Sequence, residues 1–149
     1  MKWTLQIALD ESEPDLPRRT LFKPALDLLN QRFQLQDTGL CLRIVSLEES
    51  QHLNQQFRGK NHPTNVLSFP FDEADYLGDL VFCHSLIATE AMAQHKTLKA
   101  HYQHLLIHGV LHLLGYDHET ENEALEMESI EIELLATLDI ANPYETDHD

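Results

Sequence analysis

The sequence has 149 residues, 42% of them hydrophobic, and its 25 acidic against 10 basic side chains give a formal net charge of −15. A chain of this length buries a core without disulfides or a structural metal, so we expect a single domain over residues 1–149. It contains no apolar run of about 18 residues, and its two cysteines, Cys41 and Cys83, form no CxxC pair. These features argue against a membrane-spanning or disulfide-stapled protein and favour a reducing, cytoplasmic compartment.

The acidic charge is concentrated toward the C-terminus. Residues 117–149 hold 12 acids and no lysine or arginine, whereas residues 1–116 hold 13 acids and all 10 basic side chains. Overall acidity argues against nucleic-acid binding, because phosphate contacts depend on lysine and arginine. That objection weakens greatly once the acidic run is set aside. We interpret the run as a solvated helix face in preference to an interaction segment.

The N-terminal third of the sequence predicts two strands around a helix. Residues 3–9 alternate apolar and polar side chains, as a half-buried strand does. Pro14 and Pro17 then break the chain before a helix with an apolar face from about residue 21 to 33. Residues 40–45 alternate again and predict the second strand.

The middle of the sequence predicts a short helix and a strand pair. Ser46 with Glu49 is a capping-box signature for a helix that ends near Arg58-Gly59. Two further apolar runs are separated by acidic residues, and Gly78 closes the turn between them. The sequence thus predicts a strand over 65–71, an acidic turn over 72–75 and a second strand over 79–82.

The remaining residues predict helices, at about 86–96, at about 100–114 and from Thr120, where Thr120 and Glu123 form another capping box. The last helix is acidic on one side and apolar on the other. Its apolar positions are Leu125, Ile130, Leu134 and Leu138. We expect an α+β fold, with about four strands in a small mixed sheet and about five helices, and a short frayed tail over about 142–149.

Histidines are clustered on the helix at about 100–114. His108 and His112, at i and i+4, point in the same direction from adjacent turns and can place two nitrogens about 2.0 to 2.1 Å from one zinc ion. Gly115 can end the helix and reverse the chain, which carries His118 back as a third ligand. Three imidazoles leave a fourth tetrahedral position open, as in a catalytic zinc site. The sequence therefore predicts a zincin-like metal-binding helix.

Two more histidines, His101 and His104, share this helix face, and we interpret them as helix surface or pocket wall. His104 and His108 repeat the i, i+4 spacing but lack a third ligand after a glycine turn. The spacing HxxxHxxGxxH is that of metzincin peptidases, in which a general-base glutamate follows the first histidine. Gly109 occupies that position here and cannot transfer protons, so peptide hydrolysis is disfavoured.

Three sequence blocks resemble those of a known family. Residues 108–118, HGVLHLLGYDH, are similar to the histidine signature of the bacterial YbeY endoribonucleases. Residues 57–70, FRGKNHPTNVLSFP, and residues 78–80, GDL, resemble two further blocks of that family, in the same order. The likeness spans nearly the whole chain, and only the long acidic tail looks unusual.

The resemblance implies a zinc-dependent, single-strand-specific endoribonuclease that processes the 3′ end of small-subunit ribosomal RNA and serves ribosome quality control. By position, it implies that His108, His112 and His118 bind one zinc ion and that activity depends on Arg58. Residue chemistry adds that the Arg58 guanidinium could bind two phosphate oxygens and stabilise charge developing on them, and that Lys60 is a weaker candidate for an added phosphate contact. The implied partners are ribosomal RNA and the small ribosomal subunit, with no membrane or DNA partner.

Several alternatives stay open at this level. Imidazole also suits nickel, copper and iron, so the native metal is not fixed. Arg58 could be a surface cation at a helix end, and Asp117 could orient an imidazole or satisfy the turn backbone. No general base is visible, and the nucleophile could be a metal-activated water or the 2′-hydroxyl of the RNA. A metal-containing ribosome-assembly factor with incidental hydrolysis is the alternative function.

Overall fold

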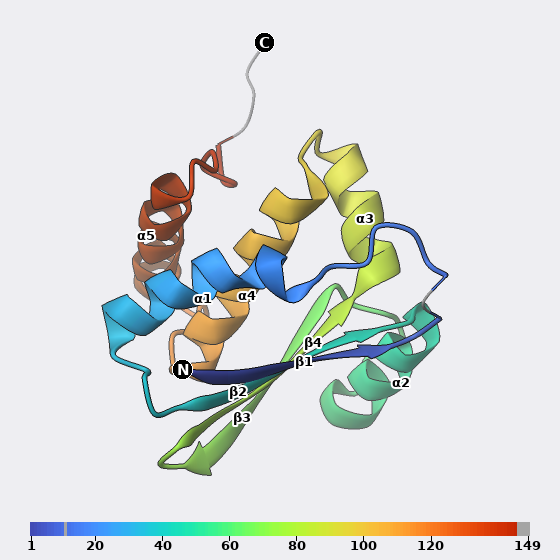
Figure 1. The fold of residues 1–149 in the computed structure, drawn as a ribbon, viewed down its shortest axis with the longest axis horizontal. Helices are drawn as coiled ribbons and strands as arrows, with labels where there is room; N and C mark the ends of the chain where they lie inside the picture. The colour runs from blue at the N-terminus through green and yellow to red at the C-terminus, as the bar shows by residue number, and fades with distance from the viewer. Residues whose placement is uncertain (11, 146–149) are drawn as a thin grey trace.

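The computed structural model describes residues 1–10 and 12–145, and this part of the chain confirms the expected α+β fold. Its strands and helices alternate at first and are followed by three consecutive helices (Figure 1). In chain order they are β1 (Lys2–Ala8), α1 (Arg19–Phe33), β2 (Gly39–Val45), α2 (Leu47–Arg58), β3 (Val66–Glu73), β4 (Tyr76–Cys83), α3 (His84–Ala93), α4 (Leu98–Leu113) and α5 (Glu121–Thr137).

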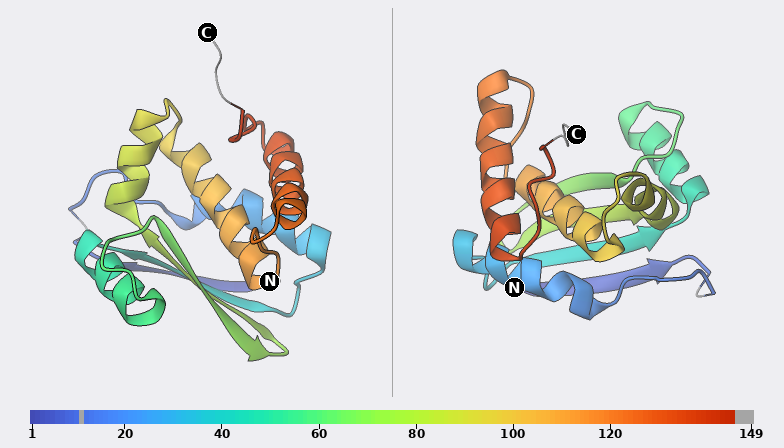
Figure 2. Two further views of the ribbon diagram at one scale, coloured as in Figure 1. Left: turned by 180° about the vertical axis from the view of Figure 1, so that it is seen from behind. Right: turned by 90° about the horizontal axis from the view of Figure 1, so that it is seen from above.

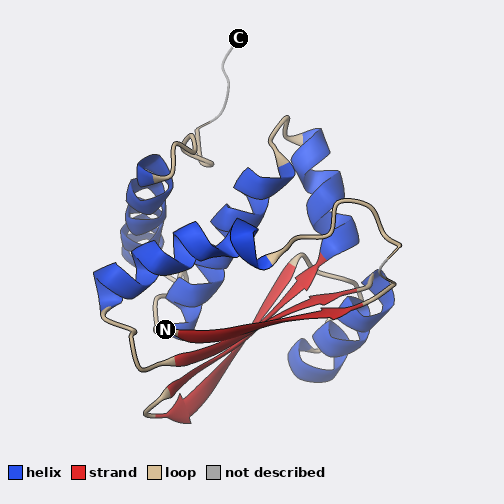
Figure 3. Cartoon of the chain, viewed as in Figure 1, coloured by secondary structure: helices blue, strands red, loops and turns tan. Residues whose placement is uncertain are grey.

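The four strands form one mixed sheet in the order β1-β2-β4-β3 (Figure 3). β1 and β2 are parallel, as are β2 and β4, whereas β3 and β4 form an antiparallel pair. The parallel pairs need crossovers, which the segments containing α1 and α2 supply. In this order β3 is an edge strand, and its first residues lie beside the site described below.

The alternation of apolar side chains gives the sheet two covered faces. One face of the sheet is covered by α1 and α4, with α5 packed on α4 in the same main core, and the other face packs against α2 (Figures 1 and 2). The main core includes Leu40, Leu42, Ile44, Leu80 and Phe82 of the sheet. The smaller cluster contains Val45, Leu67 and Val81, with Leu53 of α2 packed against it. α4 is therefore enclosed by the sheet and by neighbouring helices.

The capping signals placed the starts of α2 and α5 correctly. The side chain of Ser46 accepts a hydrogen bond from the Glu49 N–H at the start of α2, and that of Thr120 accepts one from the Glu123 N–H at the start of α5. The carboxylate of Glu49 does not complete the capping box but pairs with Arg43 at 2.8 Å. No helix within residues 1–10 and 12–145 is long and apolar enough to cross a membrane.

Two expectations about the middle and the C-terminal helix were wrong. The β3–β4 turn comprises only residues 74–75, so Gly78 lies inside β4. Its φ of +152° and its closeness to the Phe69 carbonyl leave no room for a Cβ, so glycine is needed for strand packing. Leu125 is 59% exposed and does not belong to the buried face of α5. That face contains Met127 and Leu135, which the apolar spacing had not identified.

Candidate metal centre and adjoining cleft

Helix α4 presents His108 and His112 from adjacent turns. The helix is capped by Thr97, whose hydroxyl accepts from the Ala100 N–H at 3.0 Å, and it continues without interruption from Leu98 to Leu113. The two Nε2 atoms lie 3.1 Å apart, with both side chains half-buried. The predicted i, i+4 pair therefore converges on one point.

The chain reverses directly after α4 and brings His118 to the same point. Gly115 has a φ of +101°, and its N–H donates to the carbonyl of His112 at 3.0 Å. The N–H of Tyr116 donates to the carbonyl of Leu111 at 3.0 Å. These two bonds make a Schellman motif, which confirms the predicted glycine turn.

The three imidazoles form a group suited to a metal ion. One ligand atom from each of His108, His112 and His118 lies within 4.8 Å of the others. The His118 ring stacks on that of His108 at a centroid distance of 5.9 Å and meets that of His112 edge-on at 5.1 Å. Tetrahedral coordination with zinc–nitrogen bonds of about 2.0 to 2.1 Å separates ligands by about 3.4 Å. Small ring movements would bring these nitrogens to that spacing, so the residues fit the ion.

Hydrogen bonds fix which nitrogen each helical histidine offers. Nδ1 of His108 donates to Oε1 of Glu131 at 2.8 Å, and Nδ1 of His112 donates to the Tyr116 carbonyl at 3.1 Å. Both Nε2 atoms are then left with free lone pairs, as metal ligands require. Burial and the neighbouring His108 and His118 lower the pKa of His112, which favours the neutral, ligating form.

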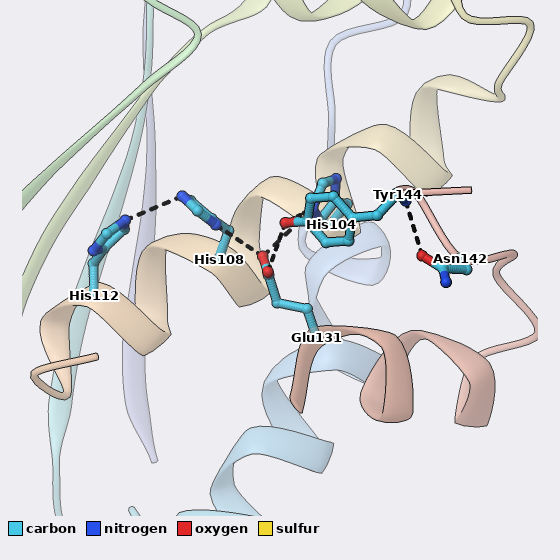
Figure 4. Close-up of polar contacts among 6 residues, drawn as sticks. All are labelled: His104, His108, His112, Glu131, Asn142 and Tyr144. Atoms are coloured by element: carbon cyan, nitrogen blue, oxygen red, sulfur yellow. Dashed lines mark hydrogen bonds and ion pairs between the residues drawn. The ribbon is translucent and has the colours of Figure 1, made fainter. Parts of the chain in front are cut away.

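The carboxylate beside this group, Glu131 of α5, was missed by the sequence analysis. Glu131 is completely buried, and it accepts from His108 and, at 2.6 Å, from the hydroxyl of Tyr144 (Figure 4). Burial opposes its ionisation, but hydrogen bonds from His104, His108 and Tyr144 lower its pKa to about 2. One signal was available, because Glu131 lies four residues after Met127 and four before Leu135, on the same helix face as these buried apolar side chains.

The structure separates the roles of the other polar residues near the centre. Oδ1 of Asp117 accepts from the His118 N–H at 2.7 Å, so Asp117 satisfies the turn, and the carboxylate that orients an imidazole is Glu131. His104 lies on the wall of the adjoining cleft, as expected. His101 does not line the cleft, since its side chain is buried and its Nε2 donates to Glu90 at 2.9 Å.

A cleft of about 630 Å³ adjoins the three histidines. It lies between α4, the end of α2, the loop 59–65 and the start of β3. Its walls bring together the predicted ligands and the two predicted phosphate-binding residues. The lining includes Asn54, Arg58, Lys60, Asn65, Ser68, His104, His108, His112, His118, Glu119 and Tyr144.

The cationic wall of the cleft is held in place by the chain around it. Nη2 of Arg58 donates to the Ser68 carbonyl of β3 at 2.8 Å. Two buried residues of α2 fix the loop that follows. Ser50 exchanges hydrogen bonds with the backbone of Thr64, at 2.8 and 3.0 Å, and Nδ2 of Asn54 donates to the His62 carbonyl at 2.8 Å. Sequence reasoning had missed both of these α2 residues.

The helix position after His108 faces the sheet. Gly109 is buried, and a Cβ there would lie 2.7 Å from Cδ2 of Leu80. A glutamate at this position would collide with the core before it reached the cleft. Packing as well as chemistry therefore disfavours a peptidase.

Comparison with known proteins agrees with this geometry. The family model described as "Endoribonuclease YbeY" matches residues 7–139. The chain belongs to the YbeY family. The match includes the three histidines, Arg58 and Glu131, but ends before Tyr144.

Named relatives cover most of the chain. The endoribonuclease YbeY of Acinetobacter baumannii is 47% identical, over 97% of this chain and 99% of its own length. That of Colwellia psychrerythraea is 54% identical over 73% of this chain and 74% of its own length, and that of Francisella tularensis subsp. novicida is 42% identical over 91% and 90%. The solution structure of TM1509 from Thermotoga maritima has a TM-score of 0.59 and 24% identity, covering 96% of this chain and 100% of that one, and has the same overall fold.

Proposed function

We propose that this protein is a zinc-dependent endoribonuclease that cuts single-stranded RNA, processes the 3′ end of small-subunit ribosomal RNA and serves ribosome quality control. One observation carries the proposal. The three-imidazole group lies on the same cleft as Arg58 and Lys60. Relatives named endoribonuclease YbeY, at 42 to 54% identity, support the choice of RNA as substrate.

In this proposal, His108, His112 and His118 hold the ion. A bound divalent ion supplies Lewis-acid chemistry, which suits the negatively charged phosphodiester and the activation of a nucleophile. The surrounding residues keep the three rings in place. Glu131 and the Tyr116 carbonyl fix the two helical imidazoles with Nε2 toward the ion.

Arg58 and Lys60 bind the RNA backbone. The guanidinium of Arg58 is already fixed by one hydrogen bond to the Ser68 carbonyl, and its remaining N–H groups are the donors available to phosphate oxygens. Charge that develops on those oxygens during cleavage is stabilised by a cationic donor that is already held on the cleft wall. Lys60, two residues further on the same wall, adds a second cation.

The test is cleavage of a precursor small-subunit ribosomal RNA fragment by purified protein. Wild type should cut near the mature 3′ end, His112→Ala should lose cleavage while keeping its circular dichroism spectrum, and Arg58→Ala should be severely impaired. Arg18→Ala, an exposed arginine that does not line the cleft, is the matched control and should cut normally.

The products also decide the nucleophile. Attack by the 2′-hydroxyl leaves a 2′,3′-cyclic phosphate and a 5′-hydroxyl, whereas attack by water leaves no cyclic phosphate. If the wild type and all three variants cut equally, the cleavage comes from a contaminant. If none cuts but all bind the small subunit, the protein is a ribosome-assembly factor and the nuclease proposal is wrong.

A further inference from the structure

Glu131 is a buried anion whose partners are not lysine or arginine. Within the described part of the chain, its ion-pair partners are His108 at 2.8 Å and His104 at 3.4 Å, both facing Oε1. Oε2 accepts from the Tyr144 hydroxyl. A buried charge is costly unless it is paired and hydrogen-bonded. The location of this anion, directly behind one of the three converging histidines, therefore needs a reason beyond packing.

The contact with His108 determines how that histidine faces the cleft. With its Nδ1–H donated to Glu131, the ring directs Nε2 toward His112. A carboxylate behind a ligating imidazole both orients the ring and raises its basicity. A divalent ion at the three histidines would in turn offset the buried negative charge through His108.

The second oxygen of Glu131 connects this arrangement to the C-terminal segment. Beyond α5, the chain returns so that Tyr144 reaches back to the helix, and its N–H donates to Oδ1 of Asn142 at 2.8 Å (Figure 4). The Tyr144 ring also meets that of His104 edge-on, at a centroid distance of 5.6 Å. Residues 142–145 are thus anchored, which corrects the prediction of a frayed tail there. Residues 146–149 lie outside the described residues.

We propose that Glu131 and Tyr144 are positioning residues of the metal centre, and that the C-terminal segment completes it. Glu131 fixes the tautomer and direction of His108, and Tyr144 holds the carboxylate in place for that contact. The inference rests on the proposed function only in that the three histidines bind a metal ion. It does not depend on RNA cleavage.

The test is zinc affinity, measured by competition with a chromophoric chelator. Glu131→Gln removes the charge with little change in shape and should weaken zinc binding about 10- to 100-fold, the usual effect of losing such a partner. Tyr144→Phe keeps the ring against His104 but removes the hydroxyl, and should weaken binding less, by about threefold to tenfold. Glu126→Gln, exposed on the same helix, removes the same charge and should bind within about twofold of wild type.

A second readout distinguishes positioning from general stability. In zinc-loaded protein, the imidazole ¹H–¹⁵N signal of the His108 Nδ1–H should shift in both Glu131→Gln and Tyr144→Phe but not in Glu126→Gln. If Glu131→Gln folds and binds zinc like wild type, the proposal is wrong. If that variant does not fold, Tyr144→Phe decides, and wild-type affinity with an unshifted signal would overturn the proposal. Wild-type protein that binds no zinc would instead overturn the metal-dependent function itself.

Discussion

Helix α4 carries two histidine–carboxylate pairs, two turns apart, and they differ in outcome. At the N-terminal end His101 donates to Glu90 of α3, and toward the C-terminal end His108 donates to Glu131 of α5. The two histidines lie on one helix face and each has a carboxylate partner from another helix. Only the His108 pair opens onto a group of converging nitrogens.

The His101–Glu90 pair is closed, because neither ring nitrogen of His101 is accessible to a metal ion. Its imidazole is buried and uses Nε2, the atom at the tip of the ring, to reach Glu90. Nδ1 is buried as well and has no hydrogen-bond partner among the described residues. The amide of Asn65 donates to the same carboxylate at 3.0 Å, so this pair joins α4, α3 and the start of β3. Its geometry is that of a structural contact.

The His108 pair uses the opposite nitrogen. Because Nδ1 reaches Glu131, the tip nitrogen Nε2 is left facing His112 and the cleft. The comparison shows that a carboxylate partner does not identify a ligand. What matters is which ring nitrogen that partner occupies and whether other donors converge on the remaining one.

The largest expected difference between the two pairs is in metal binding. His108→Ala should lose one-to-one zinc binding, with affinity falling on the order of 10³-fold, because one of three ligands is gone. His101→Ala should bind zinc within about threefold of wild type. Equilibrium dialysis with metal analysis measures both zinc affinities. Equal losses in the two variants would contradict the distinction between a structural pair and a metal-binding pair.

The effects on stability should be in the reverse order, with His101→Ala more destabilising than His108→Ala. His101→Ala leaves the Glu90 carboxylate without its buried donor and opens a cavity, and should lower the free energy of unfolding by about 1 to 3 kcal/mol. Urea unfolding of metal-free protein checks this against His108→Ala, which truncates a half-buried side chain and should cost less. An undiminished unfolding midpoint for His101→Ala would contradict the structural role.

The glycine turn after α4 offers a sharper test of ligand delivery. Gly115→Ala places a side chain at a φ of +101° and should cost about 1 to 2 kcal/mol, with weaker zinc binding because His118 is displaced. Gly59→Ala is the matched control, since Gly59 ends α2 at a φ of +70° and also has open space around it. It should lose similar stability yet keep zinc affinity. Equal affinity loss in both variants would point to general destabilisation.

The smallest expected effect is on the pH dependence of folding stability. Burial lowers the pKa of His101 below its ordinary value of 6.5, although Glu90 opposes the shift. Its contribution to stability is therefore complete above about pH 6.5 and is lost as pH falls through the lowered pKa, because the unfolded chain takes up the proton first. Thermal unfolding from about pH 7 to 5 should show a smaller acid-induced fall in Tm for His101→Gln than for wild type. Equal falls in Tm would show that His101 does not contribute to the acid sensitivity of the fold.

Local sequence determined the helix that carries the ligands and the turn that follows it. The i, i+4 spacing of His108 and His112 fixes their common direction, because an α-helix repeats every 3.6 residues. Gly115 supplies the positive φ that reverses the chain within three residues. These relations act within a few residues, so they can be deduced without knowing how the helices pack.

Tertiary structure decided everything that depends on a second element. Glu131 lies 23 residues from His108 in sequence, and Glu90 lies 11 residues from His101, so no local period links either pair. The four histidines of one helix face differ only through what packs against them. A closed pair and an open metal centre arise on the same helix because α3 brings its carboxylate to the tip of one imidazole, whereas α5 brings its own to the base of another.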